Sequence, residues 1–331
     1  MRERGRYGVR GDGGGGDGRV KAAAIDCGTN SIRLLIADAD PATGELKDLD
    51  RRMEIVRLGQ GVDRTGRLAP EALERTLEAC RRYAAAIEGH GIEAGRIRFA
   101  ATSATRDAQN RADFVDGVRE ILGIEPEVIT GMEEAALSYT GATRELAGAG
   151  TALVVDIGGG STEFVLGNRE VTAARSVNIG CVRLTERHAL SDPPTAAQIA
   201  ALTADIDAAL DEAQEAVPLT GADTLVGLAG SVTTVAAIAL ELPAYDPAAI
   251  HHSRVPAATV GAISDRLLAS THAERAAIPV MHPGRTDVIG AGALILSRIM
   301  ARSGAAEVVV SESDILDGLL WSTVERRPGR A

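Results

Sequence analysis

The sequence is poor in cysteine, aromatic residues and long apolar runs, and each scarcity excludes a class of protein. The three cysteines, Cys27, Cys80 and Cys181, lie far apart and lack the paired spacing of a zinc site or a disulfide framework. No apolar run is long enough to span a bilayer, and the N-terminus has no apolar segment typical of a secretory signal. We therefore expect a protein of the reducing cytoplasm with no membrane partner.

Positive charge is also scarce. The chain has 35 Lys and Arg residues against 46 Asp and Glu residues, which gives a formal net charge of −11. Proteins that coat nucleic acid are usually basic, so we expect no nucleic-acid partner. If the protein binds an anion, the positive charge that binds it must be concentrated in a cleft.

Glycine, by contrast, is abundant. Residues 1–19 form a Gly-rich stretch without a periodic apolar pattern, which predicts a disordered tail. Strand patterns then alternate with helical ones, which is typical of an α/β protein. A Gly-rich segment at 148–151 predicts a boundary between two domains, at 20–145 and 146–331. We leave open whether the C-terminal helix packs back on the first domain.

Two glycine turns form an internal repeat. The segments IDCGTNSIRLLI and VDIGGGSTEFVL both join two apolar strand patterns through a tight turn. Three identities share one spacing: Asp26 with Asp156, Gly28 with Gly158, and Ser31 with Ser161. Hairpin turns commonly contain Gly and Asp, but two matched copies that open two halves favour two similarly built domains facing each other.

The residues of these turns are suited to a phosphate and a divalent cation. Glycine lets backbone amides approach a phosphate closely, as at positions 158–160, and Ser161 adds a hydroxyl donor. Carboxylates repel phosphate unless a cation lies between them. Because Mg²⁺ favours one or two carboxylates, waters and phosphate oxygens, Asp156 with Asp26 opposite is a candidate metal site.

A third glycine turn, at 227–231, lies between a strand pattern and a helical pattern. Its amides would lie at a helix N-terminus, where an anion is favoured. The turn lacks the Gly-Lys-Ser/Thr of a Walker A loop. Packing at a strand-to-helix connection also explains it, but as the third such turn in the chain it supports a phosphate site.

Acids and arginines outside the turns are further candidates. Glu133 and Glu134 begin a predicted helix, where the helix dipole favours acids. They also follow a strand and a turn, so a carboxylate here could accept a proton from an attacking water. Arg106, on a predicted loop, and Arg285, at the start of a predicted helix, could clamp phosphate. Both are equally explained as solvated arginines.

Seven segments together resemble the exopolyphosphatase/guanosine pentaphosphate phosphohydrolase (Ppx/GppA) family. In chain order they are IDCGTNSIRLLI, ATSATRDAQN, ITGMEEA, VVDIGGGSTEF, NIGCVRLTE, GLAGSVTT and HPGRTDVIGAGALIL. The resemblance implies two actin-like (ribonuclease H-like) domains of the sugar kinase/Hsp70/actin superfamily, with the active site in the interdomain cleft. It also implies a homodimer that hydrolyses terminal phosphoanhydride bonds with Mg²⁺; a monovalent cation such as K⁺ is left open.

The resemblance assigns roles to individual residues. The catalytic glutamate falls on Glu134, with Glu133 beside it, and the metal-associated acids are Asp156 and Glu163, with Asp26 opposite. Together with the turns, it gives these phosphate-binding candidates: Gly28, Asn30, Ser31, Arg33, Arg106, Gly158, Gly159, Gly160, Ser161, Gly227, Gly230, Ser231 and Arg285.

The chain departs from the family pattern near its end. Larger members carry further helical domains, whereas this chain stops shortly after VVVSESDILDGLLWS, so we expect a short, two-domain form. Where many relatives have a Gly-Leu-Arg-Glu-Gly-like segment, this chain reads DILDGLL.

Our leading hypothesis is removal of terminal orthophosphate from inorganic polyphosphate. Water would attack the terminal phosphorus in line, with Glu134 orienting or deprotonating it, while Glu163 would bind Mg²⁺ or share the handling of this water. The first alternative is hydrolysis of guanosine pentaphosphate to the tetraphosphate, although aromatic residues for stacking are scarce. A kinase or ATPase of the same fold and a non-catalytic sensor of polyphosphate or guanosine tetraphosphate are further alternatives.

Overall fold

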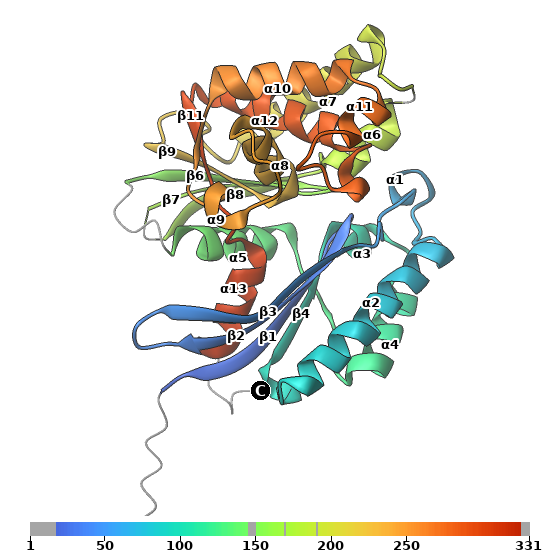
Figure 1. The fold of residues 1–331 in the computed structure, drawn as a ribbon, viewed down its shortest axis with the longest axis vertical. Helices are drawn as coiled ribbons and strands as arrows, with labels where there is room; N and C mark the ends of the chain where they lie inside the picture. Colours follow the sequence, from blue (N-terminus) through green and yellow to red (C-terminus); the bar gives the residue numbers. More distant parts are fainter. Residues whose placement is uncertain (1–17, 145–149, 169, 190, 326–331) are drawn as a thin grey trace, which may run out of the picture.

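The fold consists of two α/β lobes, each built on one mixed sheet (Figure 1). The computed structural model describes residues 18–144, 150–168, 170–189 and 191–325. Most of the predicted tail lies outside these residues, and so does part of the predicted boundary at 148–151. Lobe I is the part of the molecule around the first sheet, and lobe II is the part around the second.

Each sheet begins with three antiparallel strands. Lobe I has the order β3-β2-β1-β4-β5, from β1 (Val20–Cys27), β2 (Ser31–Asp40), β3 (Glu45–Ile55), β4 (Ile97–Ala101) and β5 (Glu127–Val128). Lobe II has the order β10-β11-β9-β6-β7-β8, from β6 (Ala152–Ile157), β7 (Thr162–Gly167), β8 (Val171–Val177), β9 (Thr224–Leu228), β10 (Arg254–Pro256) and β11 (Glu307–Val310).

Apart from β10, the second sheet repeats the first. In lobe I, β1, β2 and β3 form a meander, and β4 and β5 extend the sheet parallel to β1. In lobe II, β6, β7 and β8 form the meander, and β9 and β11 extend it parallel to β6. The internal repeat of the sequence is therefore a repeat of topology, as predicted.

Helices cover both faces of the first sheet. One face packs against α2 (Pro70–Gly89) and α4 (Arg111–Leu122), and the other against α13 (Ile315–Glu325). Strand β1 serves both faces because its side chains alternate: Ile25 packs toward α2 and α4, whereas Ala24 packs toward α13. Helix α5 (Gly131–Thr143) lies between the two sheets and contributes to the core on either side of it (Figure 1).

The remaining helices are shorter or belong to lobe II. They are α1 (Val62–Thr65), α3 (Ser103–Asp107), α6 (Cys181–His188), α7 (Ala196–Gln214), α8 (Ala229–Ala239), α9 (Pro247–Ile250), α10 (Ala257–Ala269), α11 (His272–Ala276) and α12 (Ile289–Ser303), with 3₁₀ turns η1 (Ala94–Arg96) and η2 (Pro283–Arg285). Within the described ranges, no helix combines the length and the apolarity needed to cross a membrane.

The structure corrects three local predictions. The segment with Arg106 is helix α3 rather than a loop, because the amide of Arg106 donates to the carbonyl of Thr102 (2.9 Å) and closes a helical turn. The segment CVRLTERH, predicted as strand and loop, is helix α6. The helix predicted around Arg285 begins only at Ile289, after the turn η2.

Helices α5 and α13 touch through two glycines. A Cβ on Gly141 would lie 1.9 Å from the carbonyl oxygen of Asp314, and a Cβ on Gly318 would lie 2.1 Å from the carbonyl oxygen of Leu137. Both obstructing atoms belong to the backbone, so they cannot rotate away. This contact fixes the position of Asp314, just before α13.

We expect Gly318→Ala to lower the free energy of unfolding by roughly 1–3 kcal/mol, because the added methyl group forces the two helices apart. Gly261→Ala in α10 is the control. Nothing lies within 4 Å of a Cβ at that position, so alanine should gain about 0.8–1 kcal/mol from its helix propensity. Urea unfolding followed by circular dichroism measures both variants. Equal stabilities would contradict the tight contact.

Candidate active site

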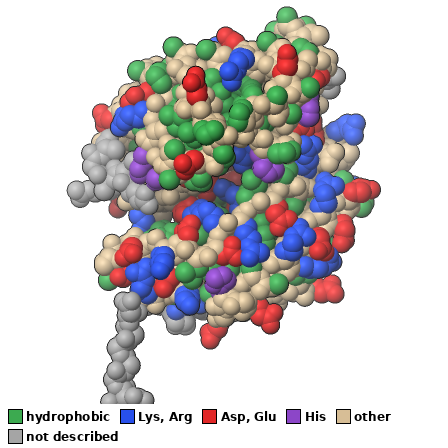
Figure 2. Space-filling model, viewed as in Figure 1, with side chains coloured by type: hydrophobic (Ala, Val, Ile, Leu, Met, Phe, Trp, Pro, Cys, Tyr) green, Lys and Arg blue, Asp and Glu red, His purple; other side chains and the backbone are tan. Residues whose placement is uncertain are grey.

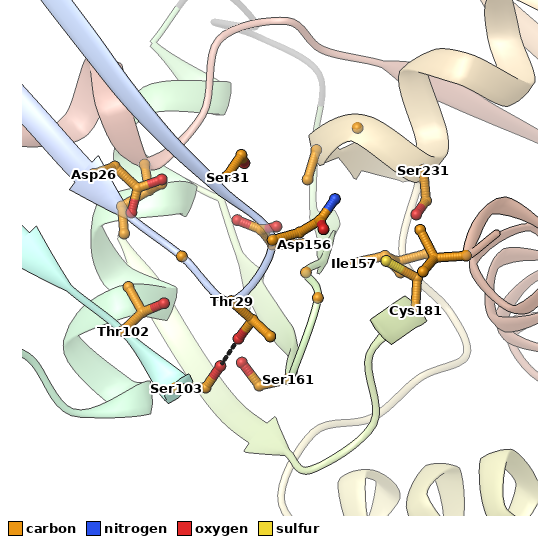
Figure 3. A pocket seen from close by; sticks show the side chains of 18 of the residues that line it. Asp26, Thr29, Ser31, Thr102, Ser103, Asp156, Ile157, Ser161, Cys181 and Ser231 are labelled. Carbon is orange, nitrogen blue, oxygen red and sulfur yellow. Dashed lines mark hydrogen bonds between the residues drawn. The ribbon is translucent and has the colours of Figure 1, made fainter. Parts of the chain in front are cut away.

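The two repeated turns face each other across the lobes. In the first turn the amide of Gly28 donates to the carbonyl of Ser31 (2.9 Å), and in the second the amide of Gly158 donates to the carbonyl of Ser161 (3.0 Å). Each turn therefore has the same closing hydrogen bond and follows the same central strand, β1 or β6. Figure 3 shows side chains from both turns around one pocket.

The turns approach so closely that the second one requires glycine. The hydroxyl oxygens of Thr29 and Ser103 are 2.8 Å apart (Figure 3), and a Cβ on Gly160 would lie 2.6 Å from each of them. A Cβ on Gly159 would lie 2.9 Å from the Cβ of Thr29. This contact explains Gly159 and Gly160, whose counterparts in the first turn are not glycines.

Most of the predicted site residues line one cavity between the lobes. They are Asp26, Gly28, Asn30, Ser31, Arg33, Glu134, Asp156, Gly158, Gly159, Ser161, Gly230, Ser231 and Arg285. Figure 2 shows basic and acidic side chains along the hollow between the two lobes. Thr29, Thr102, Ser103 and Cys181, which were not predicted, also line the cavity. The hydroxyl residues of ATSATRDAQN, shortly before Arg106, were a signal that could have found two of them.

Arg106 and Glu163 lie beside the cavity wall rather than on it. Arg106 Nη1 donates to Glu134 Oε2 (3.2 Å) and to the carbonyl of Ile129 (3.0 Å), so it holds the predicted catalytic carboxylate. Glu163 is 1% exposed and accepts a hydrogen bond from Ser176 Oγ (2.7 Å). Both residues can therefore act on the site through their neighbours.

Three other predicted residues also lie off the cavity wall. Glu133 is exposed and pairs with Arg98 (2.8 Å). Gly160 is enclosed by the contact between the turns. Gly227 lies within β9, where a Cβ would be 2.7 Å from the side chain of Val232, so the structure gives this glycine a packing role.

The two turns differ in charge at one matched position. Arg33 is in register with Asp26 and donates to its Oδ2 from Nε (3.1 Å) and Nη2 (2.7 Å), and it also donates to Asp314. In lobe II the residue in register with Asp156 is Glu163. A second carboxylate therefore stands where the first turn has an arginine, and among the described residues no cationic side chain pairs directly with Asp156 or Glu163.

Burial raises the pKa of each carboxylate in this cluster. Desolvation raises the pKa of Glu134 to about 8, despite the opposing charge of Arg106. Burial, together with the nearby carboxylate of Asp314, raises the pKa of Asp156 to about 6. Burial and the adjacent Glu134 raise the pKa of Glu163 well above its usual value. Three carboxyl groups are therefore buried close together, and among the described residues only Glu134 has a direct cationic partner, Arg106.

These carboxylates fit a divalent cation. A cation would reduce the repulsion among them and lower their pKa values. In the described residues, no group of three or more His, Cys, Asp or Glu side chains could hold a metal by itself. Mg²⁺ commonly uses only one or two carboxylates, with waters and substrate phosphates as its other ligands. Asp156, with Glu163 beside it, can provide the protein's share, whereas Asp26 is already engaged by Arg33.

The third predicted turn supplies another wall of the cavity. Ala229 has a positive φ of 67°, and Gly230 and Ser231 follow it along the wall. Arg285 donates to the carbonyl oxygen of Gly230 (3.0 Å), which keeps its guanidinium at the cavity. The first turn of α8 and this guanidinium both favour an anion here.

Asp314 is a residue that the sequence interpretation missed. It is 3% exposed and pairs with Arg33. Asp317, three positions later, pairs with Arg51 (2.5 Å). Both aspartates belong to DILDGLL, the segment where the chain departs from the family pattern. Two acids at the start of α13 were the available signal.

Comparison with known proteins gives one consistent result. The sequence matches the Ppx/GppA phosphatase family over residues 35–327. It is 51% identical over 315 residues to a Mycobacterium tuberculosis protein named exopolyphosphatase 2, and the match covers 92% of this chain and 98% of that protein.

Solved structures are similar over almost the whole chain. An exopolyphosphatase-like protein has a TM-score of 0.88 at 43% identity, covering 93% of this chain and 99% of that one. A Ppx/GppA family member from Aquifex aeolicus has a TM-score of 0.79 at 30% identity, covering 94% and 100%. An exopolyphosphatase from Cytophaga hutchinsonii has a TM-score of 0.84 at 25% identity, covering 92% and 98%. The predicted α/β fold class is confirmed, because the chain shares its fold with these solved Ppx/GppA family structures.

Arg33→Gln removes the guanidinium that lies between the buried carboxylates of Asp26 and Asp314. We expect the free energy of unfolding at pH 8 to fall by roughly 3–5 kcal/mol, the usual cost of removing one partner of a buried ion pair. The loss should shrink as the pH falls. Burial raises the folded-state pKa of Asp26 even beside Arg33, and loss of the guanidinium should raise it further. The penalty is therefore complete above the pKa that Asp26 has in the variant and disappears as the carboxylate becomes protonated.

Urea unfolding at pH 8 and pH 5 measures this difference. The control is Arg52→Gln, because Arg52 pairs with Asp50 on the surface and such pairs contribute only about 0–1 kcal/mol. Arg33 does not neutralise the buried acids if Arg33→Gln loses no more free energy of unfolding than the control. The same conclusion follows if its loss is equal at both pH values.

Proposed function

Because the chain belongs to the Ppx/GppA phosphatase family, we propose that it is an exopolyphosphatase, which hydrolyses the terminal phosphoanhydride bond of inorganic polyphosphate. The observation that carries the proposal is the cavity between the glycine turns, which combines anion-binding backbone with buried carboxylates. The name of the Mycobacterium tuberculosis relative supports the substrate. Phosphoryl transfer depends mainly on positioning and electrostatic stabilisation, and the cavity offers both.

The terminal phosphate would bind between the lobes. Its donors would be the amides of the second turn, the guanidinium of Arg285, and the hydroxyl groups of Ser31, Ser161 and Ser231, all at the cavity. These groups come from both lobes, so a bound phosphate would hold the lobes together. Water would then attack the terminal phosphorus in line with the bond to the leaving phosphate chain.

Glu134 is the proposed general base. It lines the cavity, and Arg106 holds its carboxylate in place. A general base is most effective when its pKa lies near the working pH, and burial brings the pKa of Glu134 to about 8. In this scheme Glu134 takes a proton from the attacking water, while Glu163, opposite Asp156 on the paired strand, lies beside the metal site.

Mg²⁺ is the proposed cofactor, held by Asp156 with Glu163 beside it. When bound, it would offset negative charge on the transferring phosphoryl group. Further parts of the proposal are a monovalent cation such as K⁺, a homodimer and a cytoplasmic location. The three free, buried cysteines are compatible with reducing conditions.

Phosphate release from several substrates tests the proposed function. We expect release from polyphosphates of several lengths to exceed release from guanosine pentaphosphate and from ATP. Chelation with EDTA should lower the rate at least about 10²-fold, and Mg²⁺ should restore it. Faster release from guanosine pentaphosphate would favour the first alternative, and phosphate transfer from ATP to an acceptor would indicate a kinase. Tight polyphosphate binding without turnover would indicate a sensor.

Glu134→Gln should lower kcat for polyphosphate by roughly 10²–10⁴-fold, the usual contribution of a general base, while substrate binding is retained. Glu133→Gln is the matched control on the same helix, because Glu133 lies off the cavity wall and pairs with Arg98. Steady-state phosphate release and equilibrium binding of polyphosphate measure the two effects. Near-normal turnover of Glu134→Gln would mean that another group accepts the proton.

A further inference from the structure

Arg183, on α6, joins the second glycine turn to lobe I. Its Nε donates to the carbonyl oxygen of Gly160 (2.7 Å), its Nη1 donates to Asp63, and its Nη2 donates to Asp107 (2.7 Å). Asp63 belongs to α1 and Asp107 to α3, so one planar guanidinium connects the backbone of lobe II to two carboxylates of lobe I. The side chain is only 12% exposed, which favours defined geometry at such charge-assisted hydrogen bonds.

Helix α6 also holds the other carbonyls of this turn. Its first amides donate to the carbonyl oxygens of Gly158 (3.0 Å) and Gly159 (2.9 and 3.0 Å). The guanidinium of Arg183 adds the carbonyl of Gly160. Three consecutive carbonyl groups are therefore drawn toward α6, and the third is held by a side chain rather than by the helix backbone.

The orientation of these carbonyls determines where the amides point. In a planar trans peptide the N–H of the next residue points opposite to the C=O. The amides of Gly159, Gly160 and Ser161 therefore point away from α6. Within the described part of the chain, none of the three donates a backbone hydrogen bond. Gly159 and Ser161 line the cavity, so their amides are available to phosphate oxygens.

We propose that Arg183 is a positioning residue for phosphate release. By holding the carbonyl of Gly160, it fixes the peptide whose N–H belongs to Ser161 and aims this donor at the transferring phosphoryl group. Because Arg183 does so while bound to lobe I, the donor is aligned only when the lobes are closed. The inference rests on the proposed function, since it assigns a use to the turn amides in that reaction.

The same guanidinium reaches the neighbourhood of the general base. Asp107 directly follows Arg106, and Arg106 holds the carboxylate of Glu134. Helix α3 therefore carries both an anchor for Arg183 and the partner of Glu134. Arg183 aligns the turn of lobe II with the helix that positions the base in lobe I.

Arg183→Gln and Arg183→Lys test the proposal, with Arg187→Gln as the matched control. Arg187 lies on the same helix and pairs with the same Asp63 (3.1 Å), but in the described part of the chain it pairs with Asp63 and Asp205 and not with the turn. We expect both Arg183 variants to lower kcat for polyphosphate by about 10–100-fold, because small misplacements of a catalytic donor have effects of this size. KM should change less than about threefold, because binding along the rest of the chain is untouched.

Lysine should fail to substitute because a single ammonium group lacks the planar fork that reaches three acceptors. Asp107→Asn, which leaves the contact of Arg183 with Gly160 in place, should lower kcat by an intermediate factor. The control should keep kcat within about twofold, as expected of an exposed ion pair. Thermal unfolding of each variant shows whether it is folded. If Arg183→Gln does not fold, the kcat of Arg183→Lys, which keeps the positive charge, tests the proposal instead.

Three outcomes would overturn the proposal. A kcat of Arg183→Gln within threefold of the wild type would show that the turn does not need this contact. An equal loss of kcat in Arg183→Gln and Arg187→Gln would show that the effect comes from ion pairing between the lobes in general and not from the contact with Gly160. A loss confined to KM would indicate substrate binding instead of positioning. Wild-type protein that releases no phosphate in the same assay would instead refute the proposed function on which this inference rests.

Discussion

The site depends on one steric constraint, the close packing of the second glycine turn on both of its sides. Toward lobe I, a Cβ on Gly160 would lie 2.6 Å from the hydroxyl oxygens of Thr29 and Ser103. Toward α6, a Cβ on Gly180 would lie 2.4 Å from the carbonyl carbon and oxygen of Gly159. The turn is therefore confined on both sides, and Arg183 holds the carbonyl of Gly160, which the backbone amides of α6 do not hold. A donor held in this way needs little movement when negative charge develops on a bound phosphate, so little free energy is spent on reorganising the site.

Charge then differentiates two halves that share one topology. In lobe I, the position in register with Asp26 is Arg33, which is also paired with Asp314. In lobe II, the position in register with Asp156 is Glu163. The first arrangement neutralises its acid and ties the start of α13 to β2. In the second, no cationic side chain of the described residues pairs with Asp156 or Glu163, which suits a cation near the phosphate.

Local chemistry explains which features could be predicted. The Asp-Gly-Ser spacing appears twice in the sequence and needs only a turn between two strands, so the structure reproduces it in both lobes. The short helices α3 and α6 were missed because few apolar residues mark them, and their contacts with the opposite lobe, such as Arg183 with Asp107, involve residues far apart in the chain. Glu133 and Glu134 are adjacent, and only the packing of α5 decides that Glu134 faces the cavity while Glu133 meets Arg98.

The sequence by itself determined the α/β class, the repeated turns, and the acids and glycines from which a phosphate site can be built, because these follow from short-range spacing and residue chemistry. Only the tertiary structure decided which of those residues meet. In the structure Arg33 pairs with Asp26 and Asp314, Gly227 packs within strand β9, and Arg183 lies between the lobes. The physical reason is that burial and pairing depend on residues brought together by the two sheets and by α13, and no local pattern in the sequence encodes that proximity.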